Sequence, residues 1–476
     1  MFTLQDVIAG SQELLSMHGS LADPGHLLFQ CAQHDSRQYE RDDLFVAITG
    51  ARVDGHRFIP AIARAGGAGA LCTTLSEDVP AGFLQLVVPD VVKALQATAR
   101  VRVQRQPETL KIGITGSSGK TTTKEAIAAV LGRVAPTLKT YASYNNELGY
   151  PLTLLRLEAE HRYAVLEMGA EWVGELRGLC ETIACPDWSV ITTVGAAHLK
   201  HFGSLANVAI AKSELVQVLS PEGIAFLNYD DPVVRAMKEK TRARVIYYGQ
   251  GDGAAVRALH VEERGLLGSR FTLRIEDEDV PVQLRLPGTH GITTALAAAA
   301  VGSAANIPLE SIRESLEALS PVQGRGVVKG GAGPNGSTLI DDTYNAIRHS
   351  IIAMAQAMQA TTIAPQGKRW VVLGELFEQG EHTRDEHLAS GLGLAGKVDY
   401  LVVLGDNARY YMEGALQAGM PRKAIYHFSV DTTKSTDVEE GKRAIASLLK
   451  EKVTPDDLLL IKGSRQMRME TMLSMF

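Results

Sequence analysis

The chain has 476 residues, 45% of them hydrophobic, which is enough to form several buried cores. At roughly 100–200 residues per domain, this length predicts two to four domains. The net charge of −6 comes from 48 basic and 54 acidic residues, and no Lys/Arg-rich block occurs, so we expect no nucleic-acid partner. The four cysteines are too few and too irregularly placed for a disulfide framework. Cys180 and Cys185 lack the second pair that a zinc site needs.

The first 19 residues carry acidic and polar side chains where a signal peptide needs an apolar run. The longest apolar stretch, around residues 295–301, is far shorter than the ~20 residues that a membrane-spanning helix needs. We therefore expect a soluble, cytoplasmic protein with no membrane partner. No coiled-coil pattern occurs, so a monomer is the default expectation.

The first part of the chain predicts a small N-terminal α/β domain over residues 1–108. Apolar, β-branched runs at residues 44–48 and 70–73 indicate strands, and a helical pattern at 59–65 lies between them. Residues 104–108 are polar, include a proline, and are typical of a linker.

The middle of the chain, residues 109–322, predicts a central P-loop-type ATPase domain with a mainly parallel sheet. A short buried strand at 111–115 leads into the glycine loop GSSGKT and a helix from Lys120 to about Leu131. The alternation at 261–286 favours antiparallel strands, and 295–305 is an alanine-rich helix. The remaining predicted strands are 163–167, 189–193 and 224–228. A break at Ser320–Pro321 and the glycine-rich tract 324–336 mark the end of this part.

Residues 323–476 alternate strand and helix, which predicts a doubly wound, Rossmann-like C-terminal domain. No G-x-G-x-x-G turn follows any of its strands, so a dinucleotide site is not expected. The predicted strands are 370–373, 400–404, 425–428 and 458–461, and the predicted helices lie near 385–395, 409–418 and 439–450.

The glycine loop is the strongest chemical signal in the chain. A strand, a glycine turn and a helix N-terminus together direct backbone N–H groups and the positive end of the helix dipole at an anion. Lys120 is placed to neutralise the β- and γ-phosphates of ATP, and the Thr121 hydroxyl to ligate Mg²⁺. The match is the short form G-x-x-G-K-T, because Ile114 or Thr115 stands where the longer pattern has a glycine. The alternative interpretation is a tight strand–helix turn that carries Lys-Thr by chance.

Three further residues have side chains that could contribute to such a site, and each has a more ordinary interpretation from its local sequence. Glu167 ends a predicted strand, where a carboxylate is well placed to hold Mg²⁺, although a solvent-exposed strand end is the alternative. His198 follows another strand, and such a histidine alone is more often structural than a ligand. Lys212 has the local pattern of an ordinary lysine on a helix surface.

Taken together, these motifs resemble the Mur ligase family in family order along essentially the whole chain. Within the family, the tail KGSRQMRME at 462–470 is most similar to members that attach D-Ala-D-Ala. The other matching segments are DSR (35–37), LFVA (44–47), DGH (54–56), GITGSSGKTTTKE (113–125), YNNELGYPL (144–152), EMG (167–169), GAAHL (195–199), AKSE (211–214) and DDTYNA (341–346).

The resemblance implies a role for each matching residue. For ATP binding it implies Gly116, Ser117, Ser118, Gly119, Lys120, Thr121, Thr122, Arg325, Asp342 and Asn345. For two Mg²⁺ ions it implies Thr121, Glu167, His198 and Lys212, the last carbamylated so that it offers oxygen ligands. The implied catalytic residues are Lys120, Lys212, His198 and Asn145. The implied substrate-binding residues are Ser36 and Arg37 at the uridine end, Asn146 near the acyl group, and Lys462 and Arg465 at the incoming dipeptide.

The reaction implied by the resemblance is ATP-dependent amide-bond formation in peptidoglycan precursor synthesis. ATP would activate the terminal carboxylate of a UDP-MurNAc-tripeptide as an acyl phosphate, which the amine of D-Ala-D-Ala would then attack. Domain closure would exclude the water that hydrolyses acyl phosphates.

The chain departs from the family pattern at three places. Gly291 and Thr294 stand where the family has two asparagines that help to hold adenine, so adenine selectivity is open. Ile347-Arg348-His349 follows Ala346 where Asn-Pro is usual, and Gly374-Glu375-Leu376 replaces a typical Gly-Asp-Met, with His387 still downstream. Loss of side-chain hydrogen bonds worth ~0.5–1.5 kcal/mol each weakens a base site without abolishing it.

Three alternatives remain beside this reading. One is a Mur-type paralogue with a different amine or acyl substrate. Another is a binding or scaffold protein whose activity has decayed, which the intact Lys120, Thr121, Glu167, His198 and Lys212 disfavour. The last is a general P-loop kinase or GTPase, which the lack of an Asn-Lys-x-Asp motif disfavours.

Overall fold

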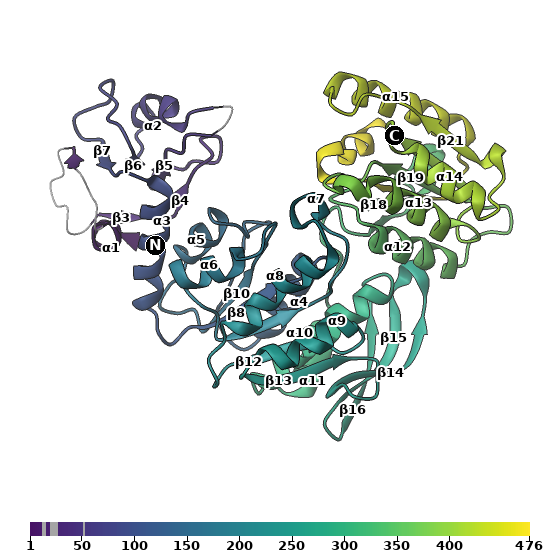
Figure 1. The fold of residues 1–476 in the computed structure, drawn as a ribbon, viewed down its shortest axis with the longest axis horizontal. Coiled ribbons are helices and arrows are strands. Elements are labelled where there is room, and N and C mark those ends of the chain that lie inside the picture. The colour runs from purple at the N-terminus through teal and green to yellow at the C-terminus, as the bar shows by residue number, and fades with distance from the viewer. Residues whose placement is uncertain (12–15, 20–26, 51–52) are drawn as a thin grey trace.

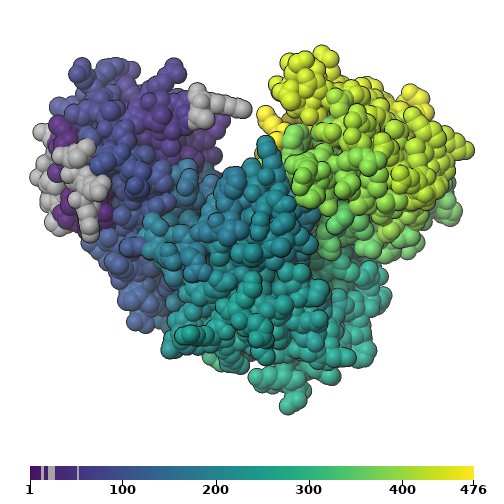
Figure 2. All heavy atoms as spheres, viewed as in Figure 1, coloured from purple at the N-terminus to yellow at the C-terminus, as the bar shows by residue number. Residues whose placement is uncertain are grey.

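The computed structural model describes residues 1–11, 16–19, 27–50 and 53–476. Three α/β domains follow one another along the chain, each built on its own sheet. The N-terminal domain (purple) and the C-terminal domain (green to yellow) stand on either side of the central domain (teal), as Figure 1 shows. A broad opening separates the two outer domains in the space-filling view of Figure 2. The predicted three-domain α/β architecture is confirmed, whereas its boundaries at 108/109 and 322/323 stay predictions.

The N-terminal domain is built on a five-stranded sheet, β2-β7-β6-β5-β4, in which only β2 is antiparallel to its neighbour. Its helix α3 runs as far as Gln104, so the first residue of the predicted linker belongs to a helix. The sheet strands are β2 (Ser16–His18), β4 (Ala32–Gln33), β5 (Leu44–Val46), β6 (Gly69–Cys72) and β7 (Leu84–Val87). Beside them lie the strand pair β1 (Phe2–Thr3) and β3 (Leu28–Phe29), and helices α1 (Leu4–Gly10), α2 (Ile59–Arg64) and α3 (Val91–Gln104).

The central domain is built on a nine-stranded sheet, in which β8 lies between β10 and β11. Its parallel part comprises β9 (Thr137–Lys139), β10 (Tyr163–Glu167), β8 (Leu110–Thr115), β11 (Trp188–Ile191), β12 (Ile224–Asn228), β13 (Arg244–Gly249) and β14 (Val256–Glu263). As predicted, the sheet then continues antiparallel, through β15 (Ser269–Ile275) and β16 (Glu278–Leu284). The segments that leave β8, β10 and β11 therefore emerge side by side at one edge of the sheet, where ligands bind in open α/β folds.

The helices of the central domain bury both faces of this sheet in separate hydrophobic cores. The predicted alanine-rich helix begins at Thr289, six residues before its expected start at Ala295. Its first turn is polar, so the sequence signal came only from the buried alanine run that follows. The helices are α4 (Lys120–Leu131), α5 (Gly149–Leu154), α6 (Glu175–Thr182), α7 (Leu199–Phe202), α8 (Leu205–Gln217), α9 (Pro232–Arg235), α10 (Thr289–Ala304) and α11 (Leu309–Glu317).

The C-terminal domain is built on a six-stranded sheet, β17-β18-β22-β19-β20-β21, parallel apart from β17. The edge strand β17 lies within the glycine-rich tract 324–336, so this tract belongs to the C-terminal sheet. The strands are β17 (Val327–Lys329), β18 (Thr338–Asp342), β19 (Arg369–Gly374), β20 (Tyr400–Leu404), β21 (Ile425–Phe428) and β22 (Leu458–Lys462). The helices are α12 (Arg348–Ala360), α13 (Thr383–Leu394), α14 (Arg409–Gln417) and α15 (Ser435–Lys452), followed by the 3₁₀ turns η8 (Arg465–Met467) and η9 (Met469–Met475).

Among the helices within the described ranges, none has both the length and the apolar character needed to cross a bilayer.

A buried lysine holds the loop that follows β9. Lys124 on α4 is 1% exposed, and its Nζ donates to the carbonyls of Thr140 at 2.7 Å and Ala142 at 2.9 Å. It also lies 3.0 Å from Oε1 of Glu125. Because buried carbonyls without a donor are costly, this ammonium fixes the course of the chain just before residue 143.

We expect Lys124→Met to lower the free energy of unfolding by about 2–4 kcal/mol, because it leaves two carbonyls unsatisfied. Lys139→Met is the matched control, since Lys139 is half exposed and pairs with the same Glu125. We expect that control to cost about 0–1 kcal/mol. Urea denaturation of both variants measures the difference, and equal effects would contradict the role of the two carbonyls.

A buried histidine fixes the loop that follows β19. His387 Nε2 accepts from the N–H of Leu376 at 3.0 Å, so its Nδ1 donates to the carbonyl of Thr383 at 2.7 Å. Burial lowers the pKa of His387 from its ordinary 6.5 to about 4. Protonation removes the acceptor and leaves a buried charge, so the neutral ring is part of the fold.

We expect the free energy of unfolding to decrease as the pH is lowered from about 6.5 to 4. Over this range the unfolded chain binds a proton at His387 that the folded protein does not yet bind. A shift of this size corresponds to roughly 3 kcal/mol at its limit. His387→Gln keeps an acceptor and a donor without titrating, so its stability curve should be flatter over this pH range. Guanidinium denaturation at pH 7.5, 6 and 5 checks this, and parallel curves for the two proteins would contradict it.

Candidate active site

The glycine loop connects β8 to α4 and is tied to the exit of β11. Gly116 has φ +147°, and a Cβ there would collide with the Thr192 hydroxyl. That hydroxyl donates to the carbonyl of Ser118 at 2.6 Å, and the Ser117 hydroxyl donates to the carbonyl of Gly195 at 2.9 Å. Lys120 Nζ donates back to the carbonyl of Gly116 at 2.8 Å. The result is a preformed anion cradle at the N-terminus of α4.

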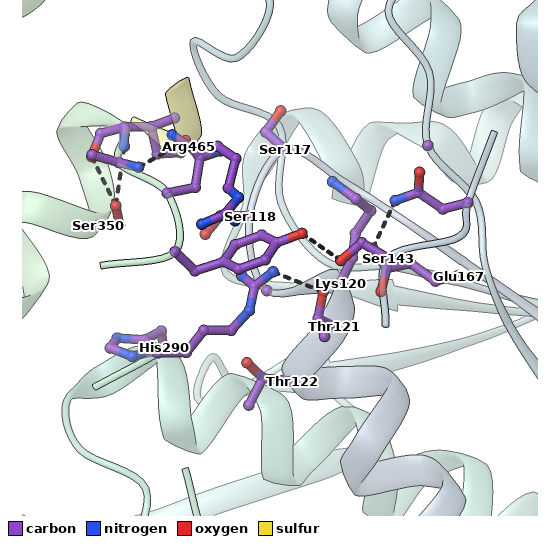
Figure 3. Close-up of a pocket in the computed structure, with 18 of the residues that line it drawn as sticks. Ser117, Ser118, Lys120, Thr121, Thr122, Ser143, Glu167, His290, Ser350 and Arg465 are labelled. Atoms are coloured by element: carbon purple, nitrogen blue, oxygen red, sulfur yellow. Dashed lines mark hydrogen bonds between the residues drawn. The ribbon is translucent and has the colours of Figure 1, made fainter. Parts of the chain in front are cut away.

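A single cavity of about 490 Å³ opens over this loop between the central and C-terminal domains. Most residues predicted from the sequence to form the site line this cavity. They are Ser117, Ser118, Gly119, Lys120, Thr121, Thr122, Asn145, Asn146, Glu167, His198, Gly291, Thr294, Arg325, Asp342, Asn345, Lys462 and Arg465. The predicted residues Gly116, Lys212, Ser36 and Arg37 do not line it. Side chains 348 residues apart in sequence, from Ser117 to Arg465, thus share one space (Figure 3).

Arg325 reaches from the chain leading into the C-terminal domain to the phosphate loop. Its guanidinium donates to the Thr121 hydroxyl at 2.9 Å and lies 4.1 Å above the ring of Tyr344. The Tyr344 hydroxyl donates to Ser143 at 2.7 Å, and Arg465 lies 5.5 Å from the same ring. Tyr344 therefore orients two cations toward the cavity. Loss of solvation inside the cavity lowers the pKa of Lys120, and Arg325 adds to this effect.

Glu167 ends β10 beside the loop and is 1% exposed. Its Oε1 accepts from Asn145 Nδ2 at 2.8 Å, whereas its Oε2 is buried without a hydrogen-bond partner. An unpartnered buried carboxylate oxygen is costly unless a donor or a cation completes it. In the described parts of the chain, no three His, Cys, Asp or Glu side chains converge into a ready-made metal centre.

Lys212 is not the ordinary surface lysine that its local pattern indicated. It is 2% exposed on α8, and its Nζ donates to the carbonyl of Ala170 at 3.0 Å. Burial, helped by the charge of Lys120, lowers the pKa of Lys212 to about 7. The amine is thus about half neutral at neutral pH, which is the form that can act as a nucleophile. Periodicity failed here because the loop 168–175 and α7 cover a helix face that looks polar in isolation.

His198 precedes α7 and has φ +54°, in the left-handed region. Its Nδ1 lies 2.6 Å from Oε2 of Glu378, in the loop after β19 of the C-terminal domain. A second carboxylate oxygen, Oε1 of Glu171, lies 3.9 Å from the same nitrogen. His198 lines the cavity, so the alternative of a purely structural histidine is disfavoured by its position.

The C-terminal wall of the cavity centres on a buried ion pair. Lys462 is 2% exposed, and its Nζ lies 2.6 Å from Oδ2 of Asp342 and donates to the carbonyl of Asn345 at 2.8 Å. The Asn345 side chain accepts from the backbone N–H of Arg465 at 3.3 Å. The residues predicted for nucleotide and for dipeptide binding are therefore in direct contact with one another.

Ser36 and Arg37 lie on a turn of the N-terminal domain that faces the central domain. Arg37 is largely exposed and pairs with Asp35 at 2.6 Å, and this hydrogen bond lowers the pKa of Asp35 to about 2. The ring of the neighbouring His34 lies 5.8 Å from the ring of Tyr144, in the loop that carries Asn145. The predicted uridine end thus adjoins the cavity without lining it.

In the part of the site predicted to hold adenine, the backbone is tightly packed at Gly291. A Cβ on Gly291 would lie 2.7 Å from the carbonyl oxygen of Leu286, so this backbone leaves no room for the asparagine that the family has here. The neighbouring His290 lines the cavity, and burial lowers its pKa. Ile347 and His349, from the segment that follows Ala346 where Asn-Pro is usual, also line the cavity, as does Ser350.

Sequence reasoning missed four residues of the site: Ser143, Tyr344, His290 and Glu378. Tyr344 belongs to the motif DDTYNA (341–346), but nothing in that sequence pattern indicates that an arginine stacks on its ring. Ser143 and Glu378 act through contacts that span 201 and 180 positions, and only the fold can reveal these.

Comparison with known proteins places this geometry in a family. Three family models match consecutive parts of the chain: "Mur ligase family, catalytic domain" over residues 29–117, "Mur ligase middle domain" over 114–302, and "Mur ligase, glutamate ligase domain" over 324–465. The UDP-N-acetylmuramoyl-tripeptide--D-alanyl-D-alanine ligase of Mycobacterium tuberculosis is 36% identical over 465 residues, covering 91% of this chain and 89% of that protein. The Escherichia coli enzyme of the same name is 34% identical over 445 residues, covering 92% and 91%.

Solved structures agree with these relatives. The crystal structure of MurF from Acinetobacter baumannii has a TM-score of 0.84 at 30% identity, covering 99% of this chain and 98% of that one. MurF ligase from Thermotoga maritima, in complex with ADP, has a TM-score of 0.77 at 26% identity, covering 95% and 98%. With a phosphate loop, a two-domain cavity and these matches along its length, the chain belongs to the Mur ligase family of ATP-dependent ligases.

Proposed function

We propose that this enzyme joins D-Ala-D-Ala to UDP-MurNAc-tripeptide, with ATP converted to ADP and phosphate, in peptidoglycan precursor synthesis. The observation that carries the proposal is the single cavity in which the phosphate loop, Asn145, Glu167 and the C-terminal residues Arg325 and Lys462 meet. The relatives named above act on these substrates, and the match to them extends through the N-terminal domain, where the uridine would bind. We place the reaction in the cytoplasm and propose that the enzyme works as a monomer.

The first step is transfer of the γ-phosphoryl group to the tripeptide carboxylate. The carboxylate oxygen bonds to phosphorus as the bond to ADP breaks. The loop N–H groups from Gly116 to Thr122 and the Lys120 ammonium hold the phosphates, and Arg325 lies close enough to neutralise charge that develops on the transferred group. The positioning of these groups supplies most of the acceleration, since phosphoryl transfer needs little covalent help from the protein.

The second step forms the amide. The D-Ala-D-Ala amine attacks the acyl carbon and loses a proton, and inorganic phosphate leaves. Asn145 and Asn146 lie on the loop that lines the cavity, next to the position proposed for the acyl group. Lys462 and Arg465 are the cations proposed to receive the dipeptide carboxylate. The cover provided by the C-terminal domain limits the access of water to the acyl phosphate.

We propose that Thr121, Glu167, His198 and a carbamylated Lys212 hold Mg²⁺, with two ions in the site. The unpartnered Oε2 of Glu167 is the kind of hard oxygen that suits this cation. When bound, Mg²⁺ would neutralise phosphate charge. The Thr121 hydroxyl oxygen accepts a hydrogen bond from Arg325 in this structure, so binding a cation there requires Arg325 to turn toward the phosphates.

The carbamate proposal follows from the chemistry of Lys212. Addition of CO₂ to a neutral amine forms an N–C bond and releases one proton, giving a side chain that ends in a carboxylate. A buried amine with a pKa near 7 is deprotonated often enough to react in this way. The resulting anion would also compensate the buried charge of Lys120.

The substrate assignment is tested by a panel of amines. Purified enzyme with ATP, Mg²⁺ and UDP-MurNAc-tripeptide should release phosphate only when D-Ala-D-Ala is added, as measured by a coupled phosphate assay. Lys120→Ala should lower this rate by about 10²–10³-fold, the range for loss of one electrostatic contact to the transition state. Equal or faster turnover with another amine would instead identify a Mur-type paralogue with a different substrate.

The role of Lys212 has its own test. We expect Lys212→Ala to lower turnover at least about 10–100-fold, the range for removal of groups around a bound metal ion. Acetate should restore part of the activity by supplying the missing carboxylate. Lys240→Ala is the matched control, because the Lys240 ammonium contacts the neighbouring Ser213 from outside α8. With ¹³C-bicarbonate, a carbamate resonance should appear in the wild-type NMR spectrum and be absent from Lys212→Ala. An unchanged rate in Lys212→Ala would contradict the carbamate role.

A further inference from the structure

We propose that Glu378 of the C-terminal domain is a positioning residue that sets the tautomer and orientation of His198, so that the proposed cation site is complete only when the two domains are docked. This inference rests on the proposed function, in which His198 is a cation ligand. Glu378 itself does not line the cavity, and it contacts the site only through the histidine.

The first argument is chemical. The carboxylate of Glu378 can only accept a hydrogen bond, so at 2.6 Å the Nδ1 of His198 must be the donor. In the neutral ring, Nε2 then carries the lone pair, which is the nitrogen that can approach a cation. A histidine that ligates a metal commonly has its other nitrogen held by a carboxylate in this manner.

The second argument is that several hydrogen bonds hold Glu378 and the loop that carries it. The backbone carbonyl of Glu378 accepts from the N–H of Lys200 at 2.8 Å, two residues after His198. Its Oε1 accepts from Gln466 Nε2 at 3.2 Å. The loop is further held by Ser464, whose hydroxyl accepts from the N–H of Phe377 at 2.9 Å, and by the bond from Leu376 to His387.

The third argument is the backbone. His198 has φ +54° and Glu378 has φ +62°, so two non-glycine residues in the left-handed region face each other across the domain boundary. Such conformations are strained for residues that carry a side chain, and they persist where the surroundings hold them. A Cβ on Gly380 would lie 3.1 Å from Cα of Lys200, so the two segments are in close contact without side chains between them. This strain has a reason if the two segments must bring the side chains of His198 and Glu378 together.

Other charged groups around His198 do not replace Glu378. Glu171 is 3.9 Å from Nδ1, and its other oxygen lies 3.0 Å from Nδ1 of His201. His201 is in turn stacked on Trp172, with ring centroids 4.6 Å apart. Glu171 therefore lies closer to His201 than to His198, while Glu378 is the carboxylate within hydrogen-bond distance of His198.

The test is a binding titration of the full-length enzyme with Mn²⁺ in the presence of a non-hydrolysable ATP analogue, followed by electron paramagnetic resonance. We expect Glu378→Gln to weaken Mn²⁺ binding about 10–100-fold, because the amide can donate to Nδ1 and so favour the wrong tautomer. Turnover should recover at saturating Mg²⁺, which a general structural defect would not allow. Glu381→Gln is the matched control, since it removes the same charge three residues away on an exposed side chain.

A double-mutant cycle decides whether Glu378 acts through His198. In a His198→Ala background, Glu378→Gln should change Mn²⁺ binding less than about 2-fold, because the coupling between two contacting residues disappears with either one. An equal effect in both backgrounds would overturn the proposal. So would an unchanged affinity in Glu378→Gln while His198→Ala weakens binding, and that outcome would leave the proposed function intact. If His198→Ala itself has no effect on Mn²⁺ binding, the metal assignment of the proposed function fails, and this inference fails with it.

Discussion

The structure of the site depends on the contact between the phosphate loop and the exit of β11. The loop must turn directly after β8, and it does so against Thr192, which leaves room only for a glycine at position 116. The Thr192 and Ser117 hydroxyls then hold the loop from both sides, through Ser118 and Gly195. Because the same segment continues to His198 and α7, the course of the loop also determines where the histidine stands. One backbone constraint therefore places both the phosphate cradle and the residue that faces the C-terminal domain.

The C-terminal domain completes what the central domain begins. Arg325 and Tyr344 approach the loop from one side, and Glu378 approaches His198 from the other. None of these contacts is hydrophobic, and each joins a charged or polar group to its counterpart across the boundary. Polar contacts of this kind separate at lower cost than apolar ones, whereas Leu266 of the central domain is buried in the hydrophobic core beside α12. The buried pair of Lys462 and Asp342 lies within the C-terminal domain, so it does not depend on the contacts between the two domains.

Sequence patterns predicted the parts of the molecule that are determined locally. The strand, glycine turn and helix around Lys120 need only neighbouring residues, and Glu167 could be placed because it ends a strand of the same sheet. Lys212 could not be placed, because it lies in the polar run Lys212-Ser213-Glu214 and its burial comes from a loop more than 30 positions away. Tyr344 and Glu378 were beyond reach for the same reason: their partners lie in another domain. The start of α10 was misjudged because its first turn serves the cavity and carries no apolar signal.

The two ends of the proposed nucleotide site are built by different means, and this chain departs from the family pattern only at the end proposed to hold the base. The phosphate end consists of backbone N–H groups and strand ends, which are fixed by the sheet. The proposed base end is lined by residues on α10 and α12, together with residues 286 and 287. A Cβ at Gly291 would lie 2.7 Å from the carbonyl oxygen of Leu286. The backbone is therefore packed more closely here than the asparagine of the family pattern would allow. Such an exchange changes the shape and hydrogen bonding offered to the base, yet it leaves the position of Lys120 unaltered. Base recognition can therefore diverge in this enzyme without any change in the geometry of phosphoryl transfer.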